Sequence, residues 1–430
     1  MAPAVPVLRA APRPRGMRTV AAICLLATLP LAALAGCTAA ATPTPSVEAD
    51  SAAPVALQFG PNLAQAAGPA PAAIATFRWS TLAGSPLGYR NSPLLTWADG
   101  RLLELGGWPK GSTGHSAAAA VYDPATRRWK RIADAPPGGS FVDGTSSAVW
   151  TGRYLAIASG NAEPCPGNPA PAPHCWPGLT LYNPTVNRWT VLAVPGQFAG
   201  LSMGPVVWTG HDLIVGAASL SAGNPDLGRL ALAAYSPTTR RWQTLTPRLP
   251  SGHQPGELNL AYDDGRLLLW SLWVDAAPPG TWGTDVLSMN SRGAWGNVTR
   301  TWPQGIQSGL TVTSDGIMVT PGGYWCGDLC AGFQTSGAAY FANPATLALT
   351  RIPAGPLSEL EPGSLEFVWA GHAIIAVSTS GDLAMYDPAT GRWSGLPARP
   401  DHPQPTSDSV WTGTELLTLT AAGKLLALQR

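Results

Sequence analysis

Residues 409–420, SVWTGTELLTLT, and residues 384–393, AMYDPATGRW, decide the fold, because variants of both phrases recur along the chain. The first phrase reads as an apolar strand, a tight turn at a glycine and a second apolar strand. Turns of the Asp-Gly or Thr-Gly type between β-rich runs are the strongest hairpin signal in a sequence. Seven such hairpins follow one another, with turn glycines at Gly100, Gly152, Gly210, Gly265, Gly316, Gly371 and Gly413.

The second phrase reads as a strand, a proline-containing turn and another strand that usually opens on Arg-Trp. An Asp or Asn before Pro favours a turn, because its side chain hydrogen-bonds the backbone while proline presets φ. Further copies are AVYDPATRRWKRI, TLYNPTVNRWTVL, AAYSPTTRRWQTL and AAYFANPATLALTRI, with a degenerate copy, VLSMNSRGAWGNV. Each repeat therefore predicts four strands, which we label a to d in chain order. The spacing between successive turn glycines, such as the one from Gly100 to Gly152, indicates a propeller.

The repeat count predicts how the ring closes. The seventh hairpin is followed only by KLLALQR, which supplies a third strand but no fourth. The segment ATFRWSTL, residues 75–82, has the character of a fourth strand and precedes the first hairpin. Pairing it with the last blade would remove two exposed sheet edges. We therefore expect an all-β fold over residues 74–430, a seven-bladed β-propeller of four-stranded blades closed by an N-terminal strand.

The N-terminus reads as an export signal over residues 1–36. An apolar run from Val20 to Ala33, broken only by Pro30, is too short to span a bilayer comfortably and ends in LAGC. LAGC resembles the lipobox of bacterial lipoproteins, which implies lipidation of Cys37. The alternative is an ordinary signal peptide cleaved at a small residue, and Met17 is a second candidate start. We expect a lipid anchor in the cell membrane, facing the extracytoplasmic side.

Residues 37–73 follow the expected lipid site and are rich in Ala, Pro, Thr and Ser. Such segments bury too little apolar surface to fold, so we expect a flexible tether. The net charge is +1, and residues 1–36 hold four arginines and no acid, so the exported chain carries 1 − 4 = −3. This balance gives no electrostatic footprint for nucleic acid. The expected partners are the membrane and an extracytoplasmic ligand, and the expected state is a monomer.

The two phrases resemble the kelch repeats of the galactose-oxidase-like propeller superfamily over residues 75–430. The resemblance implies the fold but no particular function. The paired glycines of that family appear only as Gly106-Gly107 and, displaced, Gly322-Gly323. YDPATGRW also resembles repeats of quinoprotein propellers, although the WTG turns favour kelch. The copper ligands of galactose oxidase, two tyrosines, one cross-linked to a cysteine, and two histidines, are not carried over, and no cofactor is expected.

The 18 tryptophans divide into two groups. Eleven occupy fixed repeat positions, where a large aromatic side chain fills the wedge between blades. They are Trp97, Trp150, Trp208, Trp369 and Trp411 at the end of strand a, and Trp79, Trp129, Trp189, Trp242, Trp295 and Trp393 at the start of strand d. We assign these to structure, together with Trp270 at the end of a b strand.

Strand direction sorts the connections into two faces. The a-to-b and c-to-d turns lie on one face, here called the uniform face, and are short. The b-to-c loops and the connections between blades lie on the other, the variable face, where nearly all length variation falls, and binding residues concentrate on such loops. The residues we expect to form a ligand-binding face there are Tyr89, Trp108, His115, Trp176, Trp273, Trp282, Trp302, Tyr324 and Trp325. Alternatively, these rings fold back to cover long loops.

Four cysteines remain after Cys24 and Cys37 are set aside, and an oxidising exterior favours disulfides. Local pairing, Cys165 with Cys175 and Cys326 with Cys330, is preferred because each pair lies in one b-to-c loop. A single four-thiolate zinc site would require two distant blades to meet, and Cys-x3-Cys disfavours a redox site. The histidines have no metal-ligand spacing, so no metal site is expected.

Three functions are compatible with these residues. The leading interpretation is a non-catalytic binding module that presents an aromatic face to a glycan, a peptide or an envelope partner protein. The alternative is an exported hydrolase, lyase or oxidoreductase with acids assembled around the central channel from several blades. A third is a structural subunit of an envelope complex. No catalytic motif is visible, and the acids near the variable face are scattered: Glu163, Asp226, Glu257, Asp275, Asp285 and Asp328.

Overall fold

A computed structural model describes most of the repeat region and none of the chain before residue 77. The predicted export signal and tether therefore lie outside the described residues, as do several of the long connections. The described residues are 77–112, 116–136, 147–159, 178–218, 229–251, 253–263, 265–275, 282–290, 293–296, 300–303, 310–313, 316–319, 339–357, 365–378, 380–401 and 407–430.

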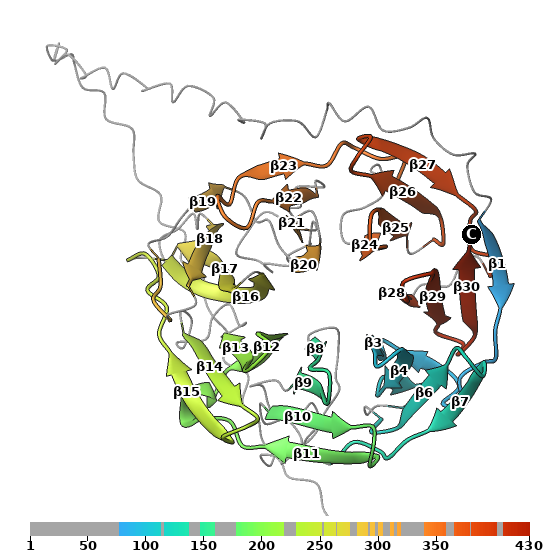
Figure 1. The fold of residues 1–430 in the computed structure, drawn as a ribbon, viewed down its shortest axis with the longest axis horizontal. Coiled ribbons are helices and arrows are strands. Elements are labelled where there is room, and N and C mark those ends of the chain that lie inside the picture. Colours follow the sequence, from blue (N-terminus) through green and yellow to red (C-terminus); the bar gives the residue numbers. More distant parts are fainter. Residues whose placement is uncertain are drawn as a thin grey trace, which may run out of the picture. The chain divides into compact units, whose positions relative to one another are not determined.

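Seven four-stranded antiparallel sheets form a propeller ring, as the sequence predicts (Figure 1). The first strand of each blade lies innermost and the fourth outermost. Blade 1 contains β3 (Leu94–Ala98), β4 (Arg101–Leu105), β6 (Ala119–Asp123) and β7 (Arg128–Arg131). Blade 2 contains β8 (Ser147–Trp150), β9 (Leu155–Ser159), β10 (Gly178–Asn183) and β11 (Arg188–Leu192), and blade 3 contains β12 (Ser202–Trp208), β13 (Leu213–Ala218), β14 (Leu230–Ser236) and β15 (Arg241–Leu245).

The remaining blades follow the same plan. Blade 4 contains β16 (His253–Asp263), β17 (Arg266–Asp275), β18 (Trp282–Met289) and β19 (Arg300–Pro303). Blade 5 contains β20 (Leu310–Thr313), β21 (Gly316–Val319), β22 (Tyr340–Ala342) and β23 (Leu349–Arg351), and blade 6 contains β24 (Leu365–Trp369), β25 (Ile374–Ser378), β26 (Leu383–Asp387) and β27 (Arg392–Leu396). Blade 7 contains β28 (Ser407–Trp411), β29 (Glu415–Thr420), β30 (Leu425–Gln429) and β1 (Arg78–Thr81).

The ring closes as predicted, with the N-terminal strand completing the last blade. Strand β1 pairs antiparallel with β30, and Trp79 lies opposite Leu428. The backbone N–H of Leu82 extends this pairing by donating to the carbonyl oxygen of Leu425, at 2.8 Å. Each end of the repeat region thus satisfies the open edge of the other.

Side chains alternate between the two faces of each blade, so each apolar layer lies between two neighbouring blades. Leu103 and Leu105 of β4 pack with Leu155 and Ile157 of blade 2. Leu102 of the same strand points the other way and packs with the β29 and β30 side chains of blade 7. The core is therefore a series of layers between blades.

The tryptophans of the fourth strands join neighbouring blades, which confirms their structural assignment. The Trp129 ring lies 5.3 Å from the Tyr122 ring, and its Nε1 donates to the carbonyl oxygen of Ala83, at 2.7 Å, on the connection leaving blade 7. Trp189 and Trp393 repeat this contact with Ala133 and Pro353, on the connections leaving blades 1 and 5. Trp270 is buried, as expected.

Two features depart from the predicted plan. The sequence predicts a long loop from Ser271 to Gly283, but β17 continues to Asp275 and β18 starts at Trp282, so most of this stretch extends blade 4. Trp295 forms only an isolated bridge to Met289, and the fourth strand of this blade begins at Arg300. The Leu-Trp-Val run at residues 272–274 suits a strand and outweighs the breaking effect of the nearby prolines.

Blade 1 also carries a short two-stranded sheet between β2 (Arg90–Asn91) and β5 (Trp108–Pro109). A 3-10 turn at Gly196–Phe198 precedes β12. Within the described part of the chain, no helix is long and apolar enough to cross a membrane.

Candidate functional site

Two of the predicted aromatic residues lie in or beside the short β2–β5 sheet of blade 1. Tyr89 immediately precedes β2, whose Asn91 pairs with Trp108 of β5. The Tyr89 side chain is 40% exposed, whereas Trp108 is half-buried. Both belong to connections at the variable end of the blade, as the sequence predicts, so an exposed ring is available there for stacking.

Three more predicted tryptophans lie in the strands of blade 4. Trp273 pairs with Gly283, the residue after Trp282, and Trp302 pairs with Thr284. Their backbone positions therefore gather at the variable end of this blade. They belong to β17, β18 and β19 and not to connecting loops, which corrects their expected setting.

The other predicted site residues lie outside the described part of the chain. They are the predicted contact residues His115, Trp176, Tyr324 and Trp325, the lipidation residue Cys37, and the predicted disulfide cysteines Cys165, Cys175, Cys326 and Cys330. Their proposed roles stay predictions.

Buried acids on the innermost strands form a second feature of the variable end. Glu366 of β24 and Asp408 of β28 stand three residues before Trp369 and Trp411, so they occupy equivalent positions in blades 6 and 7. Because strand a starts at the variable face, both carboxyls lie near that end of the ring. Blades 1 and 2 have Leu94 and Ser147 at this position.

Glu366 points across the seam toward blade 7. Its Oε1 accepts a hydrogen bond from the backbone N–H of Ser409, at 3.0 Å, while its Oε2 is buried and has no partner. Burial, and then the nearby Asp408, raise the pKa of Glu366 to about 8, against smaller opposing effects of Ser409 and Arg399. Burial also raises the pKa of Asp408, to about 6. At neutral pH one carboxyl is therefore protonated while its neighbour is ionised.

A buried arginine supports this pair from the connection between blades 6 and 7. Arg399 is 2% exposed, and its Nε donates to Asp401 Oδ1, at 2.7 Å. The second Asp401 oxygen is buried without a partner. The backbone N–H of Arg399 donates to the carbonyl oxygen of Gly381, in the b-to-c turn of blade 6, at 2.8 Å. This contact anchors the connection beside the two acids.

Glu104 is a third buried acid and lies between blades 1 and 7. It is fully buried in β4, where the other blades have Ile157, Val215, Leu269, Val319, Ala376 and Thr418 at the equivalent position. Ser85 donates a hydrogen bond to Oε2, and Oε1 has no partner. Burial raises the pKa of Glu104 to about 7, although Ser85 and Arg90 lower it. Three acids with raised pKa thus lie in the neighbouring blades 6, 7 and 1, and two of them, Glu366 and Asp408, interact with each other.

One further acid pairs with a histidine in blade 4. The Nδ1 of His253 lies 2.7 Å from Oδ2 of Asp285, which is fully buried in β18. Asp285 is one of the acids that look scattered in the sequence, but β16 and β18 bring these two residues together. The pair fixes the start of the long β16 beside the tryptophan positions of the same blade.

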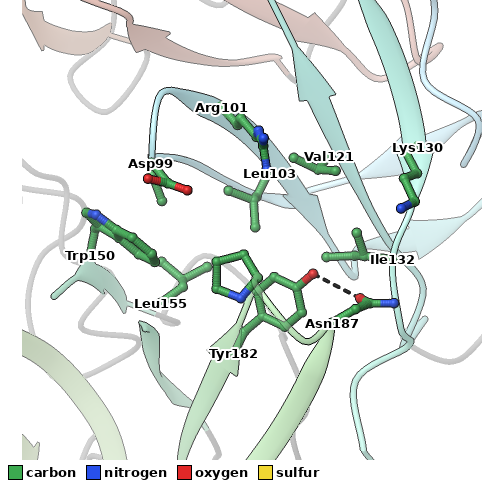
Figure 2. Close-up of a pocket in the computed structure, with 12 residues that line it drawn as sticks. Asp99, Arg101, Leu103, Val121, Lys130, Ile132, Trp150, Leu155, Tyr182 and Asn187 are labelled. Carbon is green, nitrogen blue, oxygen red and sulfur yellow. Dashed lines mark hydrogen bonds between the residues drawn. The ribbon is translucent and has the colours of Figure 1, made fainter. Parts of the chain in front are cut away.

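The described residues also enclose a small cleft on the opposite, uniform face, between blades 1 and 2 (Figure 2). Its volume of about 90 Å³ is far below the several hundred Å³ of a typical small-molecule site. Leu103, Val121 and Ile132 form part of an apolar lining, and Arg101 and Lys130 lie at its rim. The hydroxyl of Tyr182 donates to Asn187 Oδ1 at 2.9 Å within it.

Sequence reasoning missed the three acids with raised pKa because each stands inside an apolar strand phrase. The signal was nevertheless present. Glu104 replaces a residue that is apolar in five other repeats, and Glu366 and Asp408 share one repeat position. Aligning the repeats column by column would have identified all three.

The described residues contain no group of three or more His, Cys, Asp or Glu side chains able to hold a metal ion. No protein-family model matches the chain, and no curated protein matches its sequence. The chain is therefore a seven-bladed propeller whose function has to be argued from its own residues.

Proposed function

We propose that the chain is a lipid-anchored extracytoplasmic binding module whose variable face binds a ligand. The observation that carries this proposal is the difference between the two ends of the propeller. Tyr89, Trp108 and the backbone positions of Trp273, Trp282 and Trp302 all lie at the variable end. Turns on the uniform face are short and closed by hydrogen bonds, such as Thr209 N–H to the Asp212 carbonyl oxygen at 3.0 Å.

A glycan is the ligand class these residues favour over a peptide or an envelope partner protein. Aromatic faces stack on the apolar faces of sugar rings. Asp408 lies at the start of an innermost strand at the same end of the ring, and carboxylates accept hydrogen bonds from sugar hydroxyls. The lipid anchor and the extracytoplasmic location are inferred from the LAGC sequence at Cys37.

Glycan and peptide arrays probed with the purified full chain test this proposal. We expect glycan capture, and Trp282→Ala or Trp325→Ala should weaken it by about 1–3 kcal/mol per stacked ring. The matched control is Trp242→Ala, on a structural ring of blade 3 whose centroid lies 5.0 Å from that of Tyr235. The proposal would be contradicted if all three variants, compared at the same fraction of folded protein, lost glycan capture equally. It would also be contradicted if the unsubstituted chain bound no ligand on any array.

The buried acids favour one alternative, an exported propeller enzyme. A protonated carboxyl beside an ionised one is the arrangement that divides general acid and general base roles. For such an enzyme, Glu366→Gln would abolish turnover on a glycan or peptide panel and leave substrate capture intact. A binding module would show no turnover before or after the substitution.

A further inference from the structure

The uniform face of blades 1–3 carries an excess of positive charge. The a-to-b and c-to-d turns of these blades are fully described and contain only three acids, Asp99, Asp123 and Asp212. The same turns hold seven arginines, which we call the basic arc: Arg101, Arg127, Arg128, Arg153, Arg188, Arg240 and Arg241. Blades 1, 2 and 3 are consecutive in the ring, so the arc spans three neighbouring blades (Figure 1).

The arc arginines are available to a partner. All seven are exposed, and none forms an ion pair within the described residues. One of the three acids is occupied internally, because Asp123 Oδ1 accepts the backbone N–H of Ala125 at 2.9 Å. Arg101 and Lys130 also line the cleft between blades 1 and 2, together with one acid, Asp99 (Figure 2).

This charge is local and does not follow from the composition. The chain without residues 1–36 carries −3, so the excess on the arc is balanced by acids elsewhere. A one-sided basic surface on a near-neutral protein indicates a partner with a negative surface.

We infer that the basic arc docks on the anionic headgroups of the membrane that holds the lipid anchor. The sequence of residues 38–73 predicts a tether with a root-mean-square length of roughly 35 Å between that membrane and the propeller. The tether raises the effective concentration of headgroups near the arc, so weak contacts are sufficient for docking. Each Lys or Arg near an anionic bilayer contributes about 1 kcal/mol of binding free energy. Docking through the uniform face turns the variable face away from the membrane, toward its ligand. The inference rests on the lipid anchor of the proposed function, and it concerns the orientation of the propeller and not the identity of the ligand.

Vesicle flotation tests the docking. The full chain carrying Cys37→Ser, which removes the lipid, is mixed with phosphatidylcholine vesicles that contain one third phosphatidylglycerol, or with phosphatidylcholine alone. We expect binding to the anionic vesicles only, with a loss of affinity as salt rises. The leader, residues 1–36, carries four arginines and also favours anionic vesicles, but it is identical in all variants, so only the difference between variants is assigned to the arc.

Two variants of equal charge decide whether the arc is responsible. The arc variant replaces Arg127, Arg128, Arg188, Arg240 and Arg241 with Gln. The control variant replaces five exposed basic residues outside the arc, Lys110, Arg131, Arg248, Arg351 and Lys424, with Gln. We expect at least about a tenfold loss of partitioning for the arc variant and less than about threefold for the control.

Equal losses in the two variants would overturn the inference, because net charge alone would then account for binding. No preference of the unsubstituted chain for anionic vesicles would also overturn it. Glycan capture by the arc variant separates this result from the proposed function. An arc variant that captures glycan normally but no longer binds anionic vesicles supports ligand binding at the variable face and membrane docking at the uniform face.

Discussion

One residue between two blades, Glu366, combines a structural hydrogen bond with a raised pKa. Glu366 accepts the backbone N–H of Ser409 on the next blade, as Ser147 Oγ does from the N–H of Val206 at 3.2 Å. Serine forms this contact between blades without an ionisable group, so the contact itself does not require a carboxyl. The acid at blade 6, with one buried oxygen left unpaired, is therefore a candidate for function.

The raised pKa of Glu366 makes the stability of the fold depend on pH. In the folded chain this carboxyl holds its proton up to about pH 8, whereas in the unfolded chain it ionises near 4.5. Between these values the native state binds more protons, so stability falls as pH rises, by up to about 1.4 kcal/mol per pH unit for one group. Glu366→Gln should flatten the decline between pH 5 and 8, as measured by urea unfolding.

In that variant the free energy of unfolding still falls in part as pH rises, because the pKa values of Glu104 and Asp408 are also raised, to about 7 and about 6. Asp134→Asn, at an exposed acid, is the control and should leave the profile unchanged. A Glu366→Gln profile that superimposes on that of the unsubstituted chain would show that Glu366 is ionised in the folded protein.

Individual strands and turns were predictable where a local signal was strong. Asp-Pro and Thr-Gly turns located the hairpins, and the Arg-Trp openings located most of the fourth strands. Blade 4 was misread because Pro278, Pro279 and Gly280 obscured two strands that continue to Asp275 and restart at Trp282. The buried acids could not be placed from local pattern, because their burial arises from neighbouring blades that are distant in the sequence.

The tryptophan contact between blades gives a prediction for these elements. Trp129→Phe keeps an aromatic ring near Tyr122 but removes the Nε1 hydrogen bond to Ala83. Trp242→Phe is the matched control, because the Trp242 ring has the same tilted contact with a tyrosine, Tyr235, and its indole N–H forms no hydrogen bond within the described residues. In thermal or urea unfolding, Trp129→Phe should cost about 0.5–1.5 kcal/mol more than Trp242→Phe. Equal costs would mean that ring packing alone joins the blades.

The whole molecule depends on a closed ring of seven similar blades. Closure places the b-to-c connections at one end of the ring and the a-to-b turns at the other, and we propose that the first end binds the ligand and the second docks on the membrane. The number of blades and the closing strand were predictable from repeat counting. The identity of the ligand was not, because its contacts would come from connections that differ between blades.

Removal of the closing strand tests this architecture most directly. Deletion of residues 74–82 removes β1 and leaves the edge of β30 unpaired. We expect the cooperative thermal transition to be lost or its midpoint temperature to fall strongly. A peptide of residues 75–82 added in trans should restore part of it by filling the vacant edge. Deletion of residues 38–70 should leave the transition unchanged. If the chain without residues 74–82 melts like the full chain, the ring is not closed by β1, and the assignment of the two faces fails with it.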